Sequence, residues 1–367
     1  MKKVLILTTS TGQGHNQAAN SLIEAFNESG YTCVKRDFLE KTNKLLNKII
    51  VLGYEILASK IPNIYGWFYK LTDSKAINKL DYIFFLKTTR KMLKIINEEN
   101  PDVIIGTHPF TVNIISHLKR KGMTIPFISI VTDFKAHYSY VNSSVDSYIT
   151  GSEFTKDSLV KRGINANIIY PVGIPIKESF FEKDINIPYV KNDDYYNLLL
   201  MSGSMGLNNI SYVLDELLKN SHKLRITVVC GNNEHLKKTL DEKAKLNFPN
   251  KKLHIIGFSN DIASFMEYSD ILISKPGGLT VTEAIAKNLP LIIPFVIPGQ
   301  EMENTEFLTS NGYAYYVKHY SDINSTVNKL IENPEELQRM REKLKVLAAS
   351  YSLKSIINVA DKLIDKK

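Results

Sequence analysis

Short apolar runs alternate along most of the chain with longer segments whose apolar residues recur at helical spacing. The runs that read as strands lie at 3–9, 102–106, 126–131, 147–151, 168–173, 197–201, 225–230, 253–256, 270–274 and 290–294. Strands that alternate with helices are typical of parallel sheets covered by helices. Because the series stops near residue 173 and resumes at 197, the pattern predicts an α/β protein with two doubly wound domains.

The chain length agrees with this division, because 367 residues suffice for two domains of ordinary size. We expect a first domain over residues 1–175 and a second over 176–340. The last helices, 341–367, follow no further strand, so we expect them to fold back onto the first domain.

Residues 41–95 differ in composition from the rest of the first domain. From 41 to 94 there are eleven Lys or Arg against three acids, a local excess of 11 − 3 = +8, which equals the net charge of the whole chain. Large apolar side chains at helical spacing and the single tryptophan, Trp67, lie among these cations. An ordinary surface helix and attachment to an anionic bilayer both explain this pattern. Nucleic acid is disfavoured, since no base-reading motif occurs. The candidate membrane-binding residues are Lys44, Lys48, Trp67, Phe68 and Lys70.

The remaining composition indicates a protein of a reducing compartment. Cys33 and Cys230 are the only cysteines and lie far apart in the chain, which favours neither a disulfide framework nor a metal cluster. No run of about 18 apolar residues occurs, so nothing is expected to span a membrane. We therefore expect a cytoplasmic protein.

A glycine turn follows the first predicted strand. Ser10 to His15 contains Gly12 and Gly14, and we expect a helix from about Asn16 to Glu28. Gln17 stands where a dinucleotide fingerprint would have its third glycine, so that fingerprint fails. The turn brings His15 to the carboxyl end of a strand, where open α/β sheets bind ligands. His15 is either a structural hydrogen-bonding residue or a base that takes a proton from a hydroxyl nucleophile.

Polar side chains also follow the next two strands. His108 comes after 102–106, and Asp133 and His137 come after 126–131. Their spacing matches no zinc pattern. We favour an acceptor pocket beside His15 that contains Gly14, His108 and His137.

Three turns of the second domain are candidates for a sugar nucleotide site. Ser202–Gly206 and Lys275–Ala284 each place glycines between a strand and a helix, where free N–H groups bind phosphate. Pro298–Asn304 adds amide and carboxylate groups suited to a polyhydroxyl ligand. The candidate donor-binding residues are Gly203, Ser204, Phe258, Lys275, Gly277, Gly278, Leu279, Thr280, Glu283, Gln300, Glu301 and Asn304.

Four motifs together resemble one enzyme family. They are Gly-x-Gly-His-x-x-Ala-Ala (12–19), Thr-Asp-Phe (132–134), Lys-Pro-Gly-Gly-Leu-Thr-x-Thr-Glu-Ala (275–284) and Pro-Gly-Gln-Glu-x-Glu-Asn (298–304). In this order, and over essentially the whole chain, the sequence resembles the diacylglycerol glycosyltransferases. These are the processive glucosyltransferases of Gram-positive bacteria and the monogalactosyldiacylglycerol synthases, relatives of the enzyme that forms lipid II.

The resemblance implies a GT-B fold, with an N-terminal acceptor and membrane-binding domain, a C-terminal UDP-sugar domain and a cleft between them. It implies that His15 is the general base or a key acceptor residue, assisted by Asp133. Ser204 and Gly277–Thr280 would contact the diphosphate, Glu283 the ribose, Gln300 and Glu301 the sugar, and Phe258 the uracil.

The function so implied is inverting transfer of a hexose from a UDP-sugar to diacylglycerol. No Asp-x-Asp motif occurs, so we expect no metal and no cofactor. The expected partners are the UDP-hexose, diacylglycerol and anionic lipids, at the inner face of the cell membrane. Glucose and galactose both stay open as the sugar, as does the number of sugars added. The alternatives are transfer of N-acetylglucosamine to a polyprenyl-linked acceptor and a UDP-sugar sensor without turnover.

Overall fold

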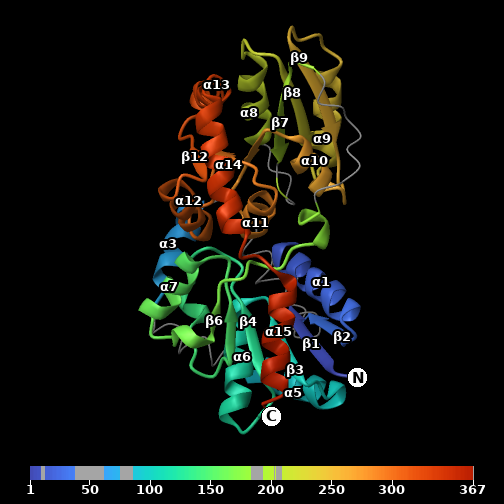
Figure 1. The fold of residues 1–367 in the computed structure, drawn as a ribbon, viewed down its shortest axis with the longest axis vertical. Coiled ribbons are helices and arrows are strands. Elements are labelled where there is room, and N and C mark those ends of the chain that lie inside the picture. The colour runs from blue at the N-terminus through green and yellow to red at the C-terminus, as the bar shows by residue number, and fades with distance from the viewer. Residues whose placement is uncertain are drawn as a thin grey trace. The chain divides into compact units, whose positions relative to one another are not determined.

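The computed structural model describes residues 1–9, 13–37, 62–74, 86–182, 193–201, 203 and 209–366. The chain divides into two compact units (Figure 1). The first comprises Met1–Glu178, Ile297–Glu303 and Ser350–Lys367, and the second comprises Ser179–Val296 and Asn304–Ala349. The division at Glu178 lies close to the predicted 175, whereas residues 341–349 stay with the second unit because α14 is one continuous helix from Pro334 to Ala348. The assignment of 297–303 to the first unit was not predicted.

The first unit contains a parallel sheet of six strands in the order β2-β1-β3-β4-β5-β6. The strands are β1 (Lys3–Thr8), β2 (Thr32–Asp37), β3 (Val103–Gly106), β4 (Phe127–Ile130), β5 (Ser147–Ile149) and β6 (Ile169–Tyr170). The helices are α1 (Gln13–Glu28), α3 (Pro62–Thr72), α5 (Leu86–Glu99), α6 (Pro109–Arg120), α7 (Glu153–Lys161) and α15 (Leu353–Ile364), with short 3-10 turns at η1 (Tyr138–Tyr140), η2 (Ala166–Ile168) and η3 (Glu178–Phe180).

The second unit repeats this plan with the strand order β12-β11-β10-β7-β8-β9. Its strands are β7 (Tyr196–Met201), β8 (Leu224–Val229), β9 (Lys251–Ile256), β10 (Ile271–Ser274), β11 (Leu291–Ile293) and β12 (Ala314–Tyr316). Its helical elements are α8 (Asn209–Leu218), α9 (Glu234–Ala244), α10 (Ile262–Tyr268), α11 (Gly278–Ala286), η4 (Tyr320–Asp322), α13 (Ile323–Ile331) and α14, and α12 runs from Gln300 to Ser310. The two doubly wound α/β domains predicted from the sequence are confirmed.

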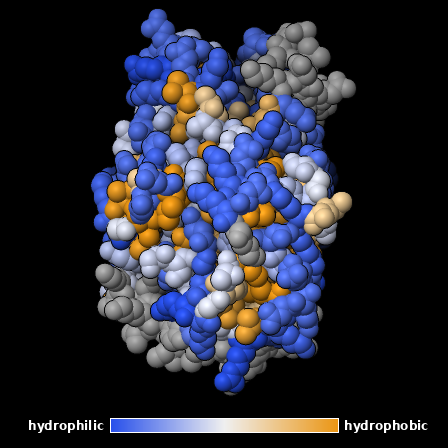
Figure 2. Space-filling model, turned by 60° about the horizontal axis from the view of Figure 1, so that its bottom comes forward, coloured by the Kyte–Doolittle hydropathy of each residue, from blue (hydrophilic) through white to orange (hydrophobic). Residues whose placement is uncertain are grey.

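Each unit has a hydrophobic core in which the central strands are buried on both faces, whereas the edge strands β2 and β9 are only partly buried. Leu5, Leu7, Ile104 and Phe127 belong to the first core, and Leu200, Ile226 and Ile273 are among the residues of the second. Continuous apolar strands of this kind are typical of parallel sheets with helices on both sides. On the face shown in Figure 2, hydrophilic side chains predominate and hydrophobic ones form separate patches.

The C-terminal segment is part of the first unit and is held there by specific contacts. The α15 helix, red in Figure 1, contacts α1 and β3. Tyr351 donates to the carbonyl of Gly151 at 2.8 Å, and its ring lies against Gly173, where a Cβ would come within 2.7 Å. Gly173 also has a φ of +93°, so a side chain there would be strained as well as crowded.

The strand order places the ligand-binding edge of each sheet. In the first sheet the chain passes from β1 to β2 on one side and returns to β3 on the other. In the second it passes from β7 to β8 and β9 and returns to β10 on the opposite side of β7. Open α/β sheets bind ligands outside the carboxyl ends of the strands at such reversals. The ligand-binding positions expected from the strand order are therefore the β1/β3 and β7/β10 edges.

Candidate functional site

His15 lies at the β1/β3 edge of the first unit. The sequence predicted Gly14 and His15 in a loop, but α1 begins at Gln13, so both residues lie in the first helical turn. His15 Nδ1 is 2.7 Å from the carbonyl oxygen of Thr107, which follows β3. A carbonyl can only accept, so Nδ1 carries the hydrogen of the neutral ring and Nε2 keeps its lone pair. This is the tautomer that a general base needs.

His108 reaches the same point from β3. Its ring centroid lies 4.5 Å from that of His15 in an edge-to-face arrangement. His108 is the N-cap of α6, where its Nδ1 accepts from the N–H of Phe110 at 3.2 Å. Leu7 of β1 is paired with Gly106 of β3, so the start of α1, which carries His15, and the start of α6, which His108 caps, follow neighbouring strands. The two predicted residues are thus brought together.

Polar groups after β4 complete this edge. Thr132 Oγ1 lies 3.3 Å from His15 Nδ1 and 3.1 Å from the hydroxyl of Tyr140. Asp133 is half-buried, and its charge raises the pKa of the buried Tyr140 phenol, second to the effect of burial. The strand order therefore brings His15, His108 and Thr132 together, and Asp133 is the next residue in the chain after Thr132.

Burial keeps the two histidines neutral. Loss of solvation lowers the pKa of His15 to about 4, although the hydrogen bond to Thr107 opposes the shift. Burial, and then the proximity of His15, holds the pKa of His108 well below its usual range. A neutral imidazole has its lone pair available near pH 7.

The rate should therefore respond to acid in a definite way. If His15 is the base, we expect kcat/KM to hold from pH 7 to pH 5 and to fall with an apparent pKa near 4, not near the ordinary value of 6.5. Between pH 6.5 and pH 4 the imidazole of the unfolded chain binds a proton that the folded protein does not bind. The free energy of unfolding therefore also falls as the pH drops from 6.5 to 4. Rates and thermal unfolding measured from about pH 3 to about pH 8 will separate the two effects. An acid limb centred at 6.5 in a folded enzyme would contradict the assignment.

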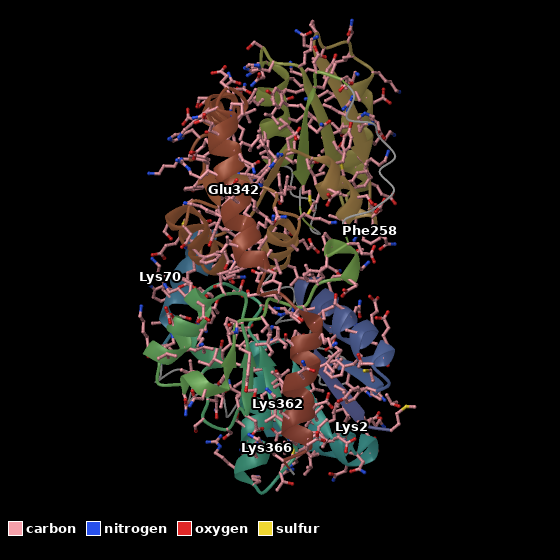
Figure 3. The ribbon with its side chains drawn as sticks, in the orientation of Figure 1. Lys2, Lys70, Phe258, Glu342, Lys362 and Lys366 are labelled. Atoms are coloured by element: carbon pink, nitrogen blue, oxygen red, sulfur yellow. The ribbon has the colours of Figure 1, made fainter. Side chains whose placement is uncertain are left out.

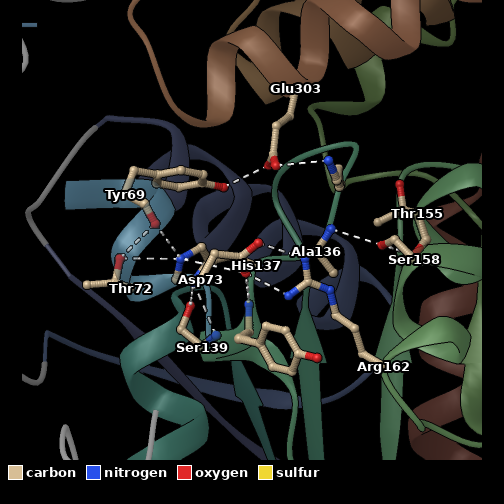
Figure 4. A network of polar contacts seen from close by, with 12 residues as sticks. Tyr69, Thr72, Asp73, Ala136, His137, Ser139, Thr155, Ser158, Arg162 and Glu303 are labelled. Carbon is tan, nitrogen blue, oxygen red and sulfur yellow. Dashed lines mark hydrogen bonds and ion pairs between the residues drawn. The ribbon is translucent and has the colours of Figure 1, made fainter. Parts of the chain in front are cut away.

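His137 lies in a separate polar network (Figure 4). Its Nδ1 caps η1 by accepting from the N–H of Ser139, and its Nε2 lies 3.3 Å from the carbonyl of Tyr69. Asp73 accepts a two-pronged hydrogen bond from Arg162 at 2.6 and 2.9 Å and lies 3.8 Å from His137. Both ring nitrogens of His137 thus face structural partners, and the network holds the end of α3 against the turn after β4.

The β7/β10 edge of the second unit carries the predicted phosphate turn. The α11 helix begins at Gly278, earlier than the predicted Val281, so Gly278, Leu279 and Thr280 form its first turn after the N-cap Gly277. The first N–H groups of a helix have no intrahelical acceptor and lie at its positive end. The half-buried Glu283 lies farther along the same helix.

Two of the predicted donor turns meet at this edge. Met201 of β7 pairs with Ser274 of β10, so Gly203 and Lys275 follow neighbouring strands. A Cβ at Gly203 would lie only 2.8 Å from Lys275 Cε, and Gly203 has a φ of +71°. Ser204 lies outside the described residues.

Asn304 supports the turn from inside the protein. It has no exposed surface, and its Nδ2 donates to the carbonyl of Pro276 at 3.0 Å. Within the second unit, this contact fixes the backbone just before Gly277. Direct contact of Asn304 with a sugar nucleotide stays a prediction.

Gln300 and Glu301 group with the first unit. Gln300 Oε1 accepts from the hydroxyl of Tyr65 at 2.6 Å. Glu301 is buried, and its Oε2 accepts from the N–H of Ile297 at 2.9 Å, which closes the turn before α12. Phe258, assigned to the uracil, follows β9 and is 61% exposed (Figure 3). The sequence signal for Gln300 gave no sign of its contact with Tyr65 of α3.

The candidate membrane-binding residues that the structure describes lie on α3. Ile64, Trp67, Phe68 and Leu71 are 51%, 66%, 51% and 46% exposed and follow the spacing of one helix face. Lys70 is also exposed and lies on α3 in Figure 3. Lys44 and Lys48 lie outside the described residues. Among the described helices, none is long and apolar enough to cross a membrane.

In the described parts of the chain, no group of three His, Cys, Asp or Glu side chains is placed to hold a metal ion. The residues that sequence reasoning missed are Thr107, Thr132 and Tyr140 around His15 and the tyrosines of α3. Thr107 and Thr132 directly follow strands, which was the available signal.

Comparison with known proteins gives the family. Residues 15–176 match the family model "Monogalactosyldiacylglycerol (MGDG) synthase", and residues 187–346 match "Glycosyl transferases group 1". The processive diacylglycerol beta-glucosyltransferase of Bacillus subtilis (strain 168) is 32% identical over 97% of this chain and 94% of its own length. The enzyme of the same name from Bacillus licheniformis is 32% identical over 100% of this chain and 97% of its own.

Solved structures agree on the fold. The MurG structure of Acinetobacter baumannii matches with a TM-score of 0.66 at 16% identity, covering 100% of both chains. Anabaena Alr3699/HepE in complex with UDP-glucose matches with a TM-score of 0.56 at 12% identity, covering 100% of this chain and 99% of that one. At these identities the likeness concerns the fold alone, and it confirms the predicted GT-B class. From its near full-length similarity to the bacterial enzymes, the chain belongs to the family of processive diacylglycerol beta-glucosyltransferases.

Proposed function

We propose that the protein is a glycosyltransferase that moves glucose from UDP-glucose to diacylglycerol and so forms a membrane glycolipid. The observation that carries this proposal is the similarity over nearly the whole chain to enzymes named for this reaction. The match of residues 15–176 to the MGDG synthase model supports diacylglycerol as the acceptor. Galactose as the sugar, and successive transfers to one lipid, are further forms of the same proposal.

The mechanism proposed is a single displacement with inversion. The hydroxyl oxygen of diacylglycerol attacks the anomeric carbon and forms the new C–O bond, while the bond to UDP breaks. The proton of the hydroxyl passes to Nε2 of His15, whose Nδ1 is held by Thr107. Asp133 assists through its charge near this edge. The leaving UDP is stabilised by the first N–H groups of α11 and by its dipole, with Glu283 on the ribose and Gln300 and Glu301 on the sugar. No metal takes part in this scheme.

The reaction is tested with purified protein, labelled UDP-glucose and diacylglycerol vesicles. We expect a labelled glycolipid on chromatography, in the presence or absence of a chelator. Competition between UDP-glucose and UDP-galactose identifies the sugar. Bound UDP-glucose without product would indicate a sensor, and product only with UDP-N-acetylglucosamine and a polyprenyl-linked lipid would indicate the other acceptor class. Activity lost with chelator and restored by a divalent ion would overturn the metal-free scheme.

We also propose that the protein works on the inner face of the cell membrane and binds anionic lipid there through α3. The exposed apolar face of α3 is suited to insertion at the depth of the lipid headgroups, and each nearby cation adds roughly 1 kcal/mol of attraction to an anionic surface.

Replacing Trp67 and Phe68 together by alanine should lower binding to anionic vesicles at least about tenfold, because two large apolar side chains no longer enter the bilayer. Vesicle co-sedimentation at two salt concentrations measures this. Val346→Ala, at an even more exposed apolar position on α14, is the control. An affinity for vesicles that does not change with salt, with the fraction of anionic lipid or with the replacement of Trp67 and Phe68 would contradict the role of α3.

A further inference from the structure

The α3 helix has a second face, opposite in character to the exposed apolar one. Tyr65 and Gly66 are buried, and Tyr69, one helical turn after Tyr65, is half-buried. Trp67 and Phe68, which lie between them in the chain, are exposed. The buried face rests on Ile297–Glu303, which belongs to the same unit although more than 230 residues separate Tyr65 from Gln300. The function proposed above assigns the sugar contacts to this segment.

The tyrosine hydroxyls hold the polar side chains of that segment. Tyr65 donates to Gln300 Oε1 at 2.6 Å, and Tyr69 donates to Glu303 Oε2 at 2.9 Å. The other carboxylate oxygen of Glu303 pairs with Lys135 at 3.1 Å. Burial and the charge of Glu303 raise the pKa of Tyr69, so its phenol stays protonated and remains a donor.

Close backbone packing makes these hydrogen bonds possible. A Cβ at Gly66 would lie 2.5 Å from Pro298 Cβ, so only glycine admits this approach. Gly299 has a φ of +113°, and both tyrosine rings would lie 3.1 Å from a Cβ placed there. The far end of α3 is fixed in turn by the hydrogen bonds of Asp73 to Arg162 and to the N–H of Tyr138 (Figure 4). Because α3 is held in this way, the hydroxyls of Tyr65 and Tyr69 occupy fixed positions.

We propose that Tyr65 and Tyr69 are positioning residues that orient Gln300 and Glu303 for the sugar of the donor. An acceptor hydrogen bond to Gln300 Oε1 fixes the orientation of the amide plane, and with it the direction in which the NH₂ group donates. Because Tyr65 acts through Gln300 and touches no part of UDP in the proposed scheme, its loss weakens recognition of the sugar and leaves recognition of UDP intact. This inference rests on the proposed function, in which Gln300 contacts the sugar.

The test compares binding of UDP-glucose and of UDP by calorimetry, without acceptor lipid. We expect Tyr65→Phe to weaken UDP-glucose binding about three- to tenfold, the scale of one neutral hydrogen bond, and to leave UDP binding unchanged. In a Gln300→Ala background the same substitution should have no further effect. Tyr69→Phe should have a smaller effect, since Lys135 still holds Glu303. Tyr212→Phe, an exposed tyrosine of α8, is the matched control.

Two results would overturn the inference. The first is wild-type affinity for UDP-glucose in both tyrosine variants. The second is an equal loss of UDP and UDP-glucose affinity, which would mean a general disturbance of the fold and would be accompanied by a lower melting temperature. The proposed function fails in a different way, by the absence of glycolipid from wild-type protein that binds UDP-glucose, so the two failures are distinguishable.

Discussion

Replacing His15 by alanine should lower kcat by at least about a hundredfold, with little change in the KM for UDP-glucose. General-base catalysis contributes about 10²–10⁴ to a rate, and the substitution removes the only group proposed to take the hydroxyl proton. The geometry supports this size of effect, because the Nδ1 hydrogen bond to Thr107 at 2.7 Å fixes the ring with Nε2 available.

The substitution also removes a partner of the Thr107 carbonyl, so stability must be measured beside the rate. His15→Gln retains hydrogen-bonding atoms at this position without a proton-accepting imidazole, and it should lose activity to a similar extent. His235→Ala, which removes an exposed histidine from the first turn of α9, is the matched control and should keep full activity. A stable His15→Ala protein with near-normal kcat would remove His15 from the base role and leave it as an acceptor-positioning residue.

Replacing Glu283 by glutamine should raise the KM for UDP-glucose about ten- to a hundredfold. Hydrogen bonds to a charged group contribute about 1.5–3 kcal/mol, and about 1.4 kcal/mol corresponds to a tenfold change in affinity. Glu283 lies on α11, whose first turn starts at the β7/β10 edge, and is half-buried there. The proposed partner is the ribose, which UDP and UDP-glucose share.

Binding of UDP alone should therefore weaken by the same factor, in contrast to the effect expected for Tyr65→Phe. Steady-state kinetics and calorimetry with both ligands measure the two quantities. Glu306→Gln, at an exposed position of α12, provides a control with the same chemical change. A Glu283→Gln protein that binds UDP normally but UDP-glucose poorly would move Glu283 from the ribose to the sugar.

Local patterns in the sequence were sufficient to predict many of the strands and helices. Residues 271–273 form a continuous apolar run because a strand of a parallel sheet is buried on both faces, and the structure places β10 (Ile271–Ser274) there. The first turn of α11 and the N-terminal part of α1 were predicted less well. In both cases the helix begins about three residues earlier than expected, since glycines that suggest a loop can also open a helix.

Side-chain pairing was less accessible to such reasoning. Asn304 reads in the sequence as a polar ligand for a sugar, which stays a prediction, and the structure adds that it is fully buried and donates to the carbonyl of Pro276. The polar character of a residue cannot distinguish contact with a ligand from contact with backbone. The position of that backbone depends on the strand order, which no local pattern contains.

By itself, the sequence determined the two series of strands and helices, the glycine turns at strand ends and the resemblance to one enzyme family. These features depend on residues close together in the chain. Only the tertiary structure decided that His15 meets His108 across β1 and β3, and that α3 holds Gln300 through Tyr65. The physical reason is that these contacts join residues far apart in the chain. His15 and His108 are 93 positions apart, and Tyr65 and Gln300 are 235 positions apart. Such pairs form only when sheet order and close packing, as at Gly66 against Pro298, bring distant segments together.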